Sequence, residues 1–392
     1  MKCNTCGSEK CEFLFSNGAH ISTRISNPPR DIYICQDCGQ VFIDVSTLTE
    51  SILQEYYSKN NPFEVPGDLI PEHQQLRVDQ AKWIIQRIPD IHQNRILDVG
   101  CGTGFLLKMY EKYGLIPQGL DFSQRMVENV RNTYKIPCYQ GWDDISAQYH
   151  FYDIISCITV LEHFLDPASV IKKFHKLLKT DGFVYLEVPD ANSPRWDMIP
   201  DHLAFEHIHH WTEFTLSTLL QLNNFSILAV EHIVNGPDSG NPEAVMRLLA
   251  QKTEKVLGSA SLFNDYQKEK EVLIEYRKKH QEYVEKIQSK LKRIEEKIGD
   301  RSYAIYCGGQ HTASLLETMK LNKNKILCIF DGDPAISGTT LYGIPVVHSS
   351  EIAKYDVNHF LLSTTNHERP IYHFLKKLNP DYQVYGIYQD FN

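Results

Sequence analysis

The chain has 392 residues, with 40 basic and 49 acidic side chains and a net charge of -9. This length accommodates two or three domains, and the negative charge argues against a general binder of nucleic acids or membrane surfaces. The sequence contains no long apolar run and no signal-like segment, so we expect a cytoplasmic protein with reduced cysteines and a small-molecule substrate bound in a pocket. It predicts no nucleic-acid or membrane partner, and it leaves the oligomeric state unknown.

Two Cys-x-x-Cys pairs open the chain, one at Cys3 and Cys6 and the other at Cys35 and Cys38. Four thiolates with this spacing can close a tetrahedral site, and zinc is its usual occupant. With four sulfur ligands and no open position the zinc would be structural, and a redox disulfide or iron are the alternatives. We expect a zinc-binding domain over residues 1–48, with strands at 31–34 and 41–43.

A tyrosine-containing segment follows at 53–62, with Tyr56 and Tyr57 ahead of a loop rich in Pro and Gly. It can either cover a pocket or form a helix end with two packing aromatics. A helix over 74–88 then leads into the next strand.

The most informative motif is an apolar strand at 96–99 that runs into Gly100, Gly102 and Gly104 and then into a helix at 105–113. Glycines allow a sharp turn and a close approach of the backbone to a ligand. No Lys-Ser/Thr pair follows, which excludes a P-loop, and the spacing is not that of a dinucleotide loop. Asp98 would repel a pyrophosphate but suits the amine of S-adenosylmethionine, so we expect that cofactor.

Later strand ends add residues to the same site. A strand at 117–120 ends at Asp121, which suits the ribose hydroxyls, and an aromatic and acidic turn follows a short strand near 137–140. A buried strand at 152–158 leads to a loop at the same edge of the sheet. The expected cofactor-binding residues are Asp98, Gly100, Cys101, Gly102, Gly104, Asp121, Phe122, Trp142, Asp143 and Thr159.

The remaining elements complete an α/β pattern. Helices are expected at 167–178 and 215–222 and strands at 182–189 and 226–230, with a loop rich in His, Glu and Trp between them. An apolar stripe within 249–300 predicts a connecting helix. From Tyr303 a second Rossmann-like unit begins, whose single Gly-Gly pair falls short of a dinucleotide fingerprint, so a structural or substrate-contacting role is expected for it.

Residues 75–235 resemble the class I S-adenosylmethionine-dependent methyltransferases. The resemblance is carried by the glycine motif, Asp121 and the run Val160-Leu161-Glu162-His163. It implies a Rossmann-like α/β core. The order of parts further resembles the sugar C-methyltransferases, which implies a zinc-binding segment at 1–48, a methyltransferase domain at 49–248, a connecting helical segment at 249–300 and a smaller Rossmann-like domain at 301–392.

That second resemblance implies C-methylation of a nucleotide-linked 4-keto-6-deoxy sugar. The family places its proposed histidine base in a Tyr-His-Glu-His motif, of which Glu206-His207 match the last two residues and Ala204-Phe205 replace the first two. Thr159 and Glu162 likewise depart from the family's Asn-Val-Leu-Ala-His run. These departures leave the substrate and the stereochemistry open.

A carbon beside a ketone must lose a proton before it attacks a methyl group, so a base and a donor to the enolate oxygen are needed. We expect His207 as the base, Glu206 to orient it, and Tyr56 or Tyr57 as the donor. A structural or substrate-binding role for His207 is equally open, and His209 and His210 are expected to pack. A metal site made of these three histidines is not expected, because they are too close in sequence to converge. An O- or N-methyltransferase and a non-catalytic binding protein that retains the cofactor fold are the alternative functions.

Overall fold

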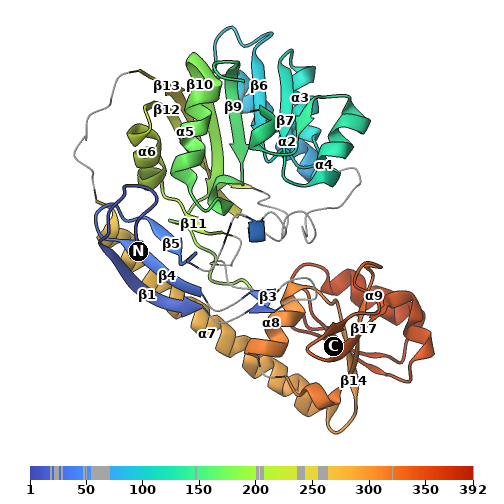
Figure 1. Cartoon of the computed structure of the whole chain (residues 1–392). Helices are drawn as coiled ribbons and strands as arrows, with labels where there is room; N and C mark the ends of the chain where they lie inside the picture. The colour runs from blue at the N-terminus through green and yellow to red at the C-terminus, as the bar shows by residue number, and fades with distance from the viewer. Residues whose placement is uncertain are drawn as a thin grey trace. The chain divides into compact units, whose positions relative to one another are not determined.

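The computed structural model describes the chain except residues 18–19, 22–25, 28–29, 47–48, 50, 54–70, 146–147, 200–202, 204–206, 236–242, 255–263, 320 and 392. The chain divides into two compact units (Figure 1). The first contains Met1–Phe15, Asp31–Pro194 and Phe205–Val272, and the second contains Ser16–Arg30, Arg195–Ala204 and Leu273–Asn392.

The first unit is built on a sheet that comprises, in the described part of the chain, seven strands in the order β12-β13-β10-β9-β6-β7-β8. Neighbours from β10 to β8 run parallel, and β13 is antiparallel to both β10 and β12. The strands are β6 (Arg95–Val99), β7 (Ile116–Leu120), β8 (Cys138–Tyr139), β9 (Tyr152–Ile158), β10 (Leu178–Pro189), β12 (Phe225–Asn235) and β13 (Glu243–Lys252).

Helices cover both faces of this sheet, as Figure 1 shows. The helices α2 (Pro71–Ile85), α3 (Phe105–Lys112) and α4 (Gln124–Asn129) share one hydrophobic cluster with the sheet, and α5 (Pro167–Leu177) and α6 (Glu213–Leu222) belong to a second. The amphipathic pattern of α3 is typical: Leu106, Leu107, Met109 and Tyr110 are buried at helical spacing. The predicted fold class, a Rossmann-like core with further segments at both ends, is confirmed.

Strand β13 is the main element that the sequence did not predict. Apart from Arg247, which is 7% exposed, its run Val245–Ala250 is apolar and buried between β10 and β12. A strand buried on both faces lacks the alternation that identifies strands, so a continuous apolar run is ambiguous. Because β13 ends at Lys252, the core sheet extends past the boundary expected at residue 248.

A smaller antiparallel sheet of the first unit has the order β1-β4-β5-β11, and β11 comes from the segment after β10. Its strands are β1 (Cys11–Asn17), β4 (Arg30–Cys35), β5 (Val41–Ile43) and β11 (His209–His210). The strands β2 (His20–Ile21) and β3 (Ser26–Asn27) pair separately and belong to the second unit. The pairing of His209 with Phe42 and of His210 with Val41 joins the cysteine-rich segment to the loop that carries His207.

The second unit contains another α/β sheet, with the order β16-β17-β15-β14-β18-β19 in the described residues. Its strands are β14 (Tyr303–Tyr306), β15 (Ile326–Asp331), β16 (Thr340–Leu341), β17 (Ile344–His348), β18 (His359–Leu362) and β19 (Gln383–Gly386), accompanied by α8 (Gln310–Thr318) and α9 (Glu368–Leu378). The long helix α7 (Tyr266–Ile298) begins in the first unit, and its apolar positions Ile287, Leu291, Ile294 and Ile298 pack into the core of the second.

Short helical turns complete the described elements: η1 (Val130–Tyr134), η2 (Trp142–Ile145), η3 (Leu161–His163), η4 (Lys323–Lys325) and η5 (Ser349–Lys354). Among the described residues, no helix is both long enough and apolar enough to cross a membrane.

Candidate active site

The site lies where the strand order of the core sheet reverses. From β6 the chain proceeds outward to β7 and β8, and it then returns to β9 on the other side of β6. In open parallel sheets, ligands bind beyond the carboxyl ends of the strands at such a point. The loops after β6, β7 and β9 carry the glycine motif, Asp121 and Glu162, respectively.

The glycine loop turns tightly after β6. Gly100 has φ +76°, and a Cβ there would overlap Cγ2 of Val160 from the loop after β9. Gly104 has φ +83°, and a Cβ there would lie 2.6 Å from Cγ2 of Val130. Neither position accepts a side chain without rearrangement. The contact with Gly100 also brings Val160, two residues before Glu162, against the predicted cofactor loop.

Asp121 is joined directly to this loop. Its Oδ2 accepts a hydrogen bond from the backbone N–H of Gly102 at 2.9 Å, and its Oδ1 accepts from the N–H of Ser123 at 2.9 Å. Gly102 itself has open space where a Cβ would stand. Such an open, backbone-lined position beside a fixed carboxylate suits a ribose whose hydroxyls donate to the acid.

Asp98 lies deeper, at the end of β6, with its side chain buried. Its Oδ1 accepts a hydrogen bond from Ser156 Oγ at 2.7 Å. Burial raises the pKa of Asp98 to about 7, because the charged form loses its hydration. A cation bound nearby would reverse this shift, which fits the sequence-based prediction of an amine as its partner.

The other predicted cofactor-binding residues differ in their contacts and in their burial. The rings of Phe122 and Trp142 both contact Phe164, with centroids 6.4 and 6.2 Å from it, while Asp143 is exposed in η2. The thiol of Cys101 is buried, lies 3.6 Å from that of Cys138 and belongs to the hydrophobic core. Thr159 has φ +51°, and its N–H donates to the carbonyl oxygen of Glu187 at 2.7 Å.

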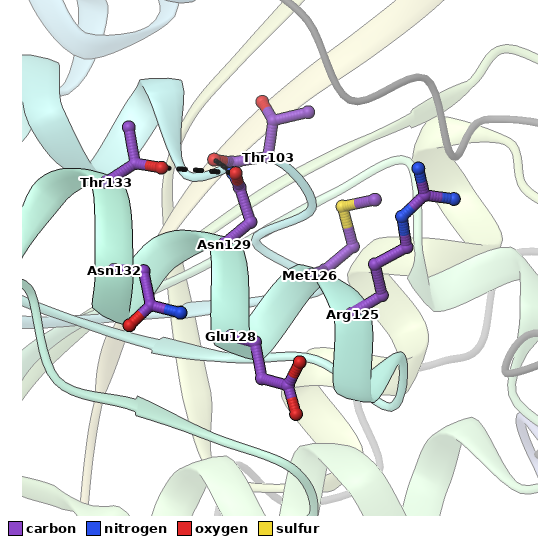
Figure 2. Close-up of a pocket in the computed structure, with 7 residues that line it drawn as sticks. All are labelled: Thr103, Arg125, Met126, Glu128, Asn129, Asn132 and Thr133. Atoms are coloured by element: carbon purple, nitrogen blue, oxygen red, sulfur yellow. Dashed lines mark hydrogen bonds between the residues drawn. The ribbon is translucent and has the colours of Figure 1, made fainter.

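A pocket of about 240 Å³ adjoins the glycine loop at Thr103 (Figure 2). The rest of its lining comes from α4 and η1. The Asn129 side chain donates to the carbonyl oxygen of Thr103 at 3.0 Å, and Thr133 donates to Asn129 at 3.2 Å. The lining of this pocket includes Thr103 and no other residue of the glycine loop. We therefore interpret the hydrogen bonds of Asn129 with Thr103 and Thr133 as contacts that stabilise the loop.

Glu162, His163 and His207 come together at the end of β9. Their ligand-type atoms all lie within 4.8 Å of one another. The Nε2 atom of His163 is 3.8 Å from Oε1 of Glu162, and the rings of His163 and His207 meet edge to face at 5.0 Å. The Glu162 side chain is 1% exposed, and burial raises its pKa to about 8.

The sequence did not predict this grouping, although it had singled out both the Val160–His163 run and His207. The signal that could have found it is the position of Glu162 and His163 directly after a predicted buried strand. Glu206, Tyr56 and Tyr57, the other predicted catalytic residues, lie outside the described residues. His209 and His210 are buried in β11, as expected for packing residues, and burial lowers the pKa of His209 to about 4.

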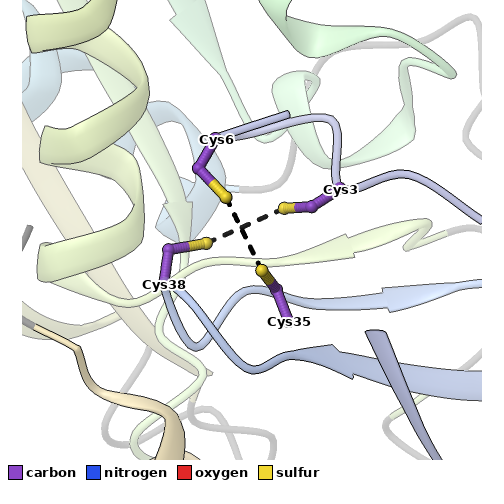
Figure 3. A group of neighbouring side chains, drawn as sticks. All are labelled: Cys3, Cys6, Cys35 and Cys38. Atoms are coloured by element: carbon purple, nitrogen blue, oxygen red, sulfur yellow. Dashed lines mark hydrogen bonds between the residues drawn. The ribbon is translucent and has the colours of Figure 1, made fainter. Parts of the chain in front are cut away.

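The four cysteines of the amino-terminal segment also converge (Figure 3). Sulfur atoms of Cys3 and Cys38 lie 3.7 Å apart, and those of Cys6 and Cys35 lie 3.6 Å apart. A tetrahedral zinc with Zn–S bonds of about 2.3 Å holds its sulfurs about 3.8 Å apart. The donor set and its spacing therefore fit a structural metal ion, while Cys11 stays outside the group.

A family model described as "Methyltransferase domain" matches residues 73–230. A ubiquinone biosynthesis O-methyltransferase of Yersinia enterocolitica is 33% identical over 145 residues, which are 35% of this chain and 59% of that protein. Its counterpart in Yersinia pestis is 30% identical over 143 residues with the same coverage. The chain thus spans about three fifths of the length of the curated relatives it matches.

Solved structures give more distant matches. An S-adenosylmethionine-dependent methyltransferase from Mesorhizobium loti is 18% identical with a TM-score of 0.37, covering 45% of this chain and 100% of that one. The magnesium protoporphyrin IX methyltransferase of Synechocystis, solved with bound S-adenosylmethionine, is 17% identical with a TM-score of 0.39 and covers 53% of this chain and 99% of that one.

Taken with the glycine loop and Asp121, the family match shows that the chain contains a class I, S-adenosylmethionine-dependent methyltransferase domain. The expected resemblance is confirmed at this level. The finer resemblance to the sugar C-methyltransferases stays a prediction.

Proposed function

We propose that this chain transfers the methyl group of S-adenosylmethionine to carbon 3 of a nucleotide-linked 4-keto-6-deoxy sugar. The observation that supports this most is that His207 groups with Glu162 and His163, and that Glu162 follows two residues after Val160, which contacts the glycine loop. In this proposal a proton acceptor would lie near the methyl donor. The order of the chain's parts supports the acceptor class.

The proposed reaction has two steps. The bond between carbon 3 and hydrogen breaks, the proton passes to a base, and its electron pair remains as an enolate conjugated with the ketone. The enolate carbon then attacks the methyl carbon in line, the S–C bond breaks, and its pair stays on sulfur. This second step depends chiefly on positioning, so a fixed cofactor loop and a fixed base are what the protein has to supply.

Deuterium exchange tests the carbon chemistry. The protein is incubated in deuterated water with a panel of nucleotide 4-keto sugars, with and without S-adenosylmethionine, and products are identified by NMR and mass spectrometry. We expect exchange at carbon 3 that disappears in His207→Ala and persists in the matched control His92→Ala, an exposed histidine of the same unit. A methylated product with no exchange at carbon, or one that carries an O-methyl group, would contradict C-methylation.

O-methylation is the second candidate, and the names of the curated relatives favour it, since both are O-methyltransferases. A hydroxyl also reacts faster when a base removes its proton, so His207 would serve either acceptor. The same product analysis separates the two. A non-catalytic binding protein would bind the cofactor without any turnover on either acceptor class.

For the amino-terminal segment we propose a structural zinc ion held by Cys3, Cys6, Cys35 and Cys38. Four thiolates leave no open position for a substrate. The ion would instead stabilise a sheet too small to bury a core of its own.

A further inference from the structure

The side chain of Glu162 ends in a buried carboxylate group. Its side chain is 1% exposed, and among the described residues neither carboxylate oxygen has a hydrogen-bond partner. An ionised carboxylate without water or a partner is costly, so it takes up a proton or binds a cation. The two imidazoles beside it are nitrogen ligands of the kind that cations of the transition series prefer.

The backbone holds this group in place. The N–H of Ile208 donates to the carbonyl oxygen of Glu162 at 2.8 Å, which connects the residue after His207 to the middle residue of η3. The N–H of His163 donates to the carbonyl oxygen of Val160 at 3.1 Å. All three side chains thus stand on backbone that is fixed by hydrogen bonds, and a site fixed in this way is suited to a metal ion.

We propose that Glu162, His163 and His207 bind a divalent transition metal ion, separate from the zinc of the four cysteines, and that this ion binds two neighbouring oxygens of the methyl acceptor. Two imidazoles and one carboxylate are a ligand set for Zn²⁺, Mn²⁺ or Fe²⁺ that leaves coordination positions open. Bonds of about 2.1 Å place such ligands about 3.0 to 3.4 Å apart. From separations of at most 4.8 Å, the ligand atoms need to approach one another by at most about 1.4 to 1.8 Å.

The metal ion would also have a role in the proposed methyl transfer, and this part of the inference rests on that proposed function. A sugar with a ketone at carbon 4 and a hydroxyl at carbon 3 offers adjacent oxygens, as does a vicinal diol. Bound through both, the ketone is polarised and the enolate oxygen is stabilised as its charge develops. The acceptor class is therefore a molecule with two neighbouring oxygens, for C- and O-methylation alike.

A bound ion also changes the role of His207. A nitrogen whose lone pair binds a metal cannot accept a proton, so with the ion bound His207 would hold the metal, and the ion would supply the base for carbon 3 by lowering the pKa of a coordinated water, which would first release its proton to solvent. The electron pair of the broken C–H bond becomes the enolate, and the transfer of the methyl group from sulfur proceeds as before. Loss of activity in His207→Ala fits both roles, so activity alone does not distinguish them.

Mn²⁺ binding tests the site directly. Mn²⁺ prefers carboxylate and imidazole to thiolates, so it reports this site while zinc stays on the cysteines. Titration followed by electron paramagnetic resonance of free Mn²⁺ should reveal about one Mn²⁺ per chain in protein of unchanged zinc content. We expect Glu162→Gln and His163→Ala to weaken binding roughly tenfold or more, and His92→Ala to bind as the wild type does.

Glu162→Gln retains the volume of the side chain and removes its buried charge, so this variant should fold. Wild-type protein that binds no Mn²⁺ at millimolar concentration overturns the proposal, as do variants that bind Mn²⁺ like the wild type. If the metal site is correct and the proposed methyl transfer is wrong, the protein will bind Mn²⁺ but will methylate none of the acceptors. The two proposals can therefore fail separately. Full methyl transfer after chelation, with zinc content retained, would remove the catalytic role of the ion.

Discussion

The backbone N–H of Ile208 donates to the carbonyl oxygen of Glu162 at 2.8 Å, while the carbonyl oxygen of Ile208 accepts from the N–H of Ile43 at 2.9 Å. The loop after β9 and the amino-terminal sheet are therefore bonded to the same residue, next to His207. Gln40 adds a hydrogen bond from its Nε2 to the carbonyl oxygen of His210 at 2.8 Å. The cysteine-rich segment thus supports the backbone that carries a candidate catalytic histidine.

Removal of a cysteine ligand should affect both metal content and the active site. We expect Cys3→Ser to lose the zinc ion and to lower the melting temperature and solubility, since the small sheet depends on the ion. Support for His207 should weaken as well, so turnover should fall further than affinity for S-adenosylmethionine. Metal analysis and calorimetric melting measure these effects. Cys11→Ser is the matched control, and a Cys3→Ser protein with full zinc content would contradict the structural site.

Two glycines of the loop should respond differently to alanine, although both have positive φ. A Cβ at Gly100 overlaps Val160, while a Cβ at Gly102 meets open space. Left-handed backbone costs about 1–2 kcal/mol for a residue with a Cβ, so both variants lose that much stability. We expect Gly100→Ala to lose a further 1–3 kcal/mol or so from overpacking, as measured by denaturant unfolding. Equal losses in the two variants would show that Val160 does not pack against this loop.

Ionisation of Asp98 should make stability depend on pH. Burial raises its pKa to about 7, above the value of about 3.9 in an unfolded chain. Between these values the folded protein holds a proton that the unfolded chain releases, so the free energy of unfolding falls as pH rises from about 4 to about 7. We expect Asp98→Asn to melt at a higher temperature than the wild type at about pH 8, with a smaller difference at about pH 5.

The same variant should bind S-adenosylmethionine more weakly, because the amide offers no charge to the predicted amine. Asp153→Asn provides a comparison on the neighbouring strand, because its carboxylate is partly exposed and bonded to Lys179. An unchanged cofactor affinity in Asp98→Asn would show that the acid has a purely structural role.

Local patterns predicted most of the fold. The amphipathic helices α3 and α5 have buried residues at helical spacing, β6 and β9 are short and mostly apolar buried strands, and the glycines mark the turn between β6 and α3. β13 was not predicted, because a strand that is buried on both faces shows no alternation and Arg247 interrupts its apolar run. The grouping of Glu162, His163 and His207 depends on the pairing of β11 with β5, which joins segments far apart in the chain and leaves no local pattern. Thus the glycine loop could be located from one local pattern, whereas the group of Glu162, His163 and His207 could not.

The central claim is that the loop after β6 binds S-adenosylmethionine, and isothermal titration calorimetry of the full chain tests it most directly. We predict one binding site per chain. Asp121→Ala should weaken it about tenfold to a hundredfold, the loss of charge-assisted hydrogen bonds of about 1.5–3 kcal/mol. Glu111→Gln, an exposed acid of α3, should bind as the wild type does. A folded wild-type protein that releases no heat with S-adenosylmethionine, and whose melting temperature the cofactor does not raise, would contradict the account.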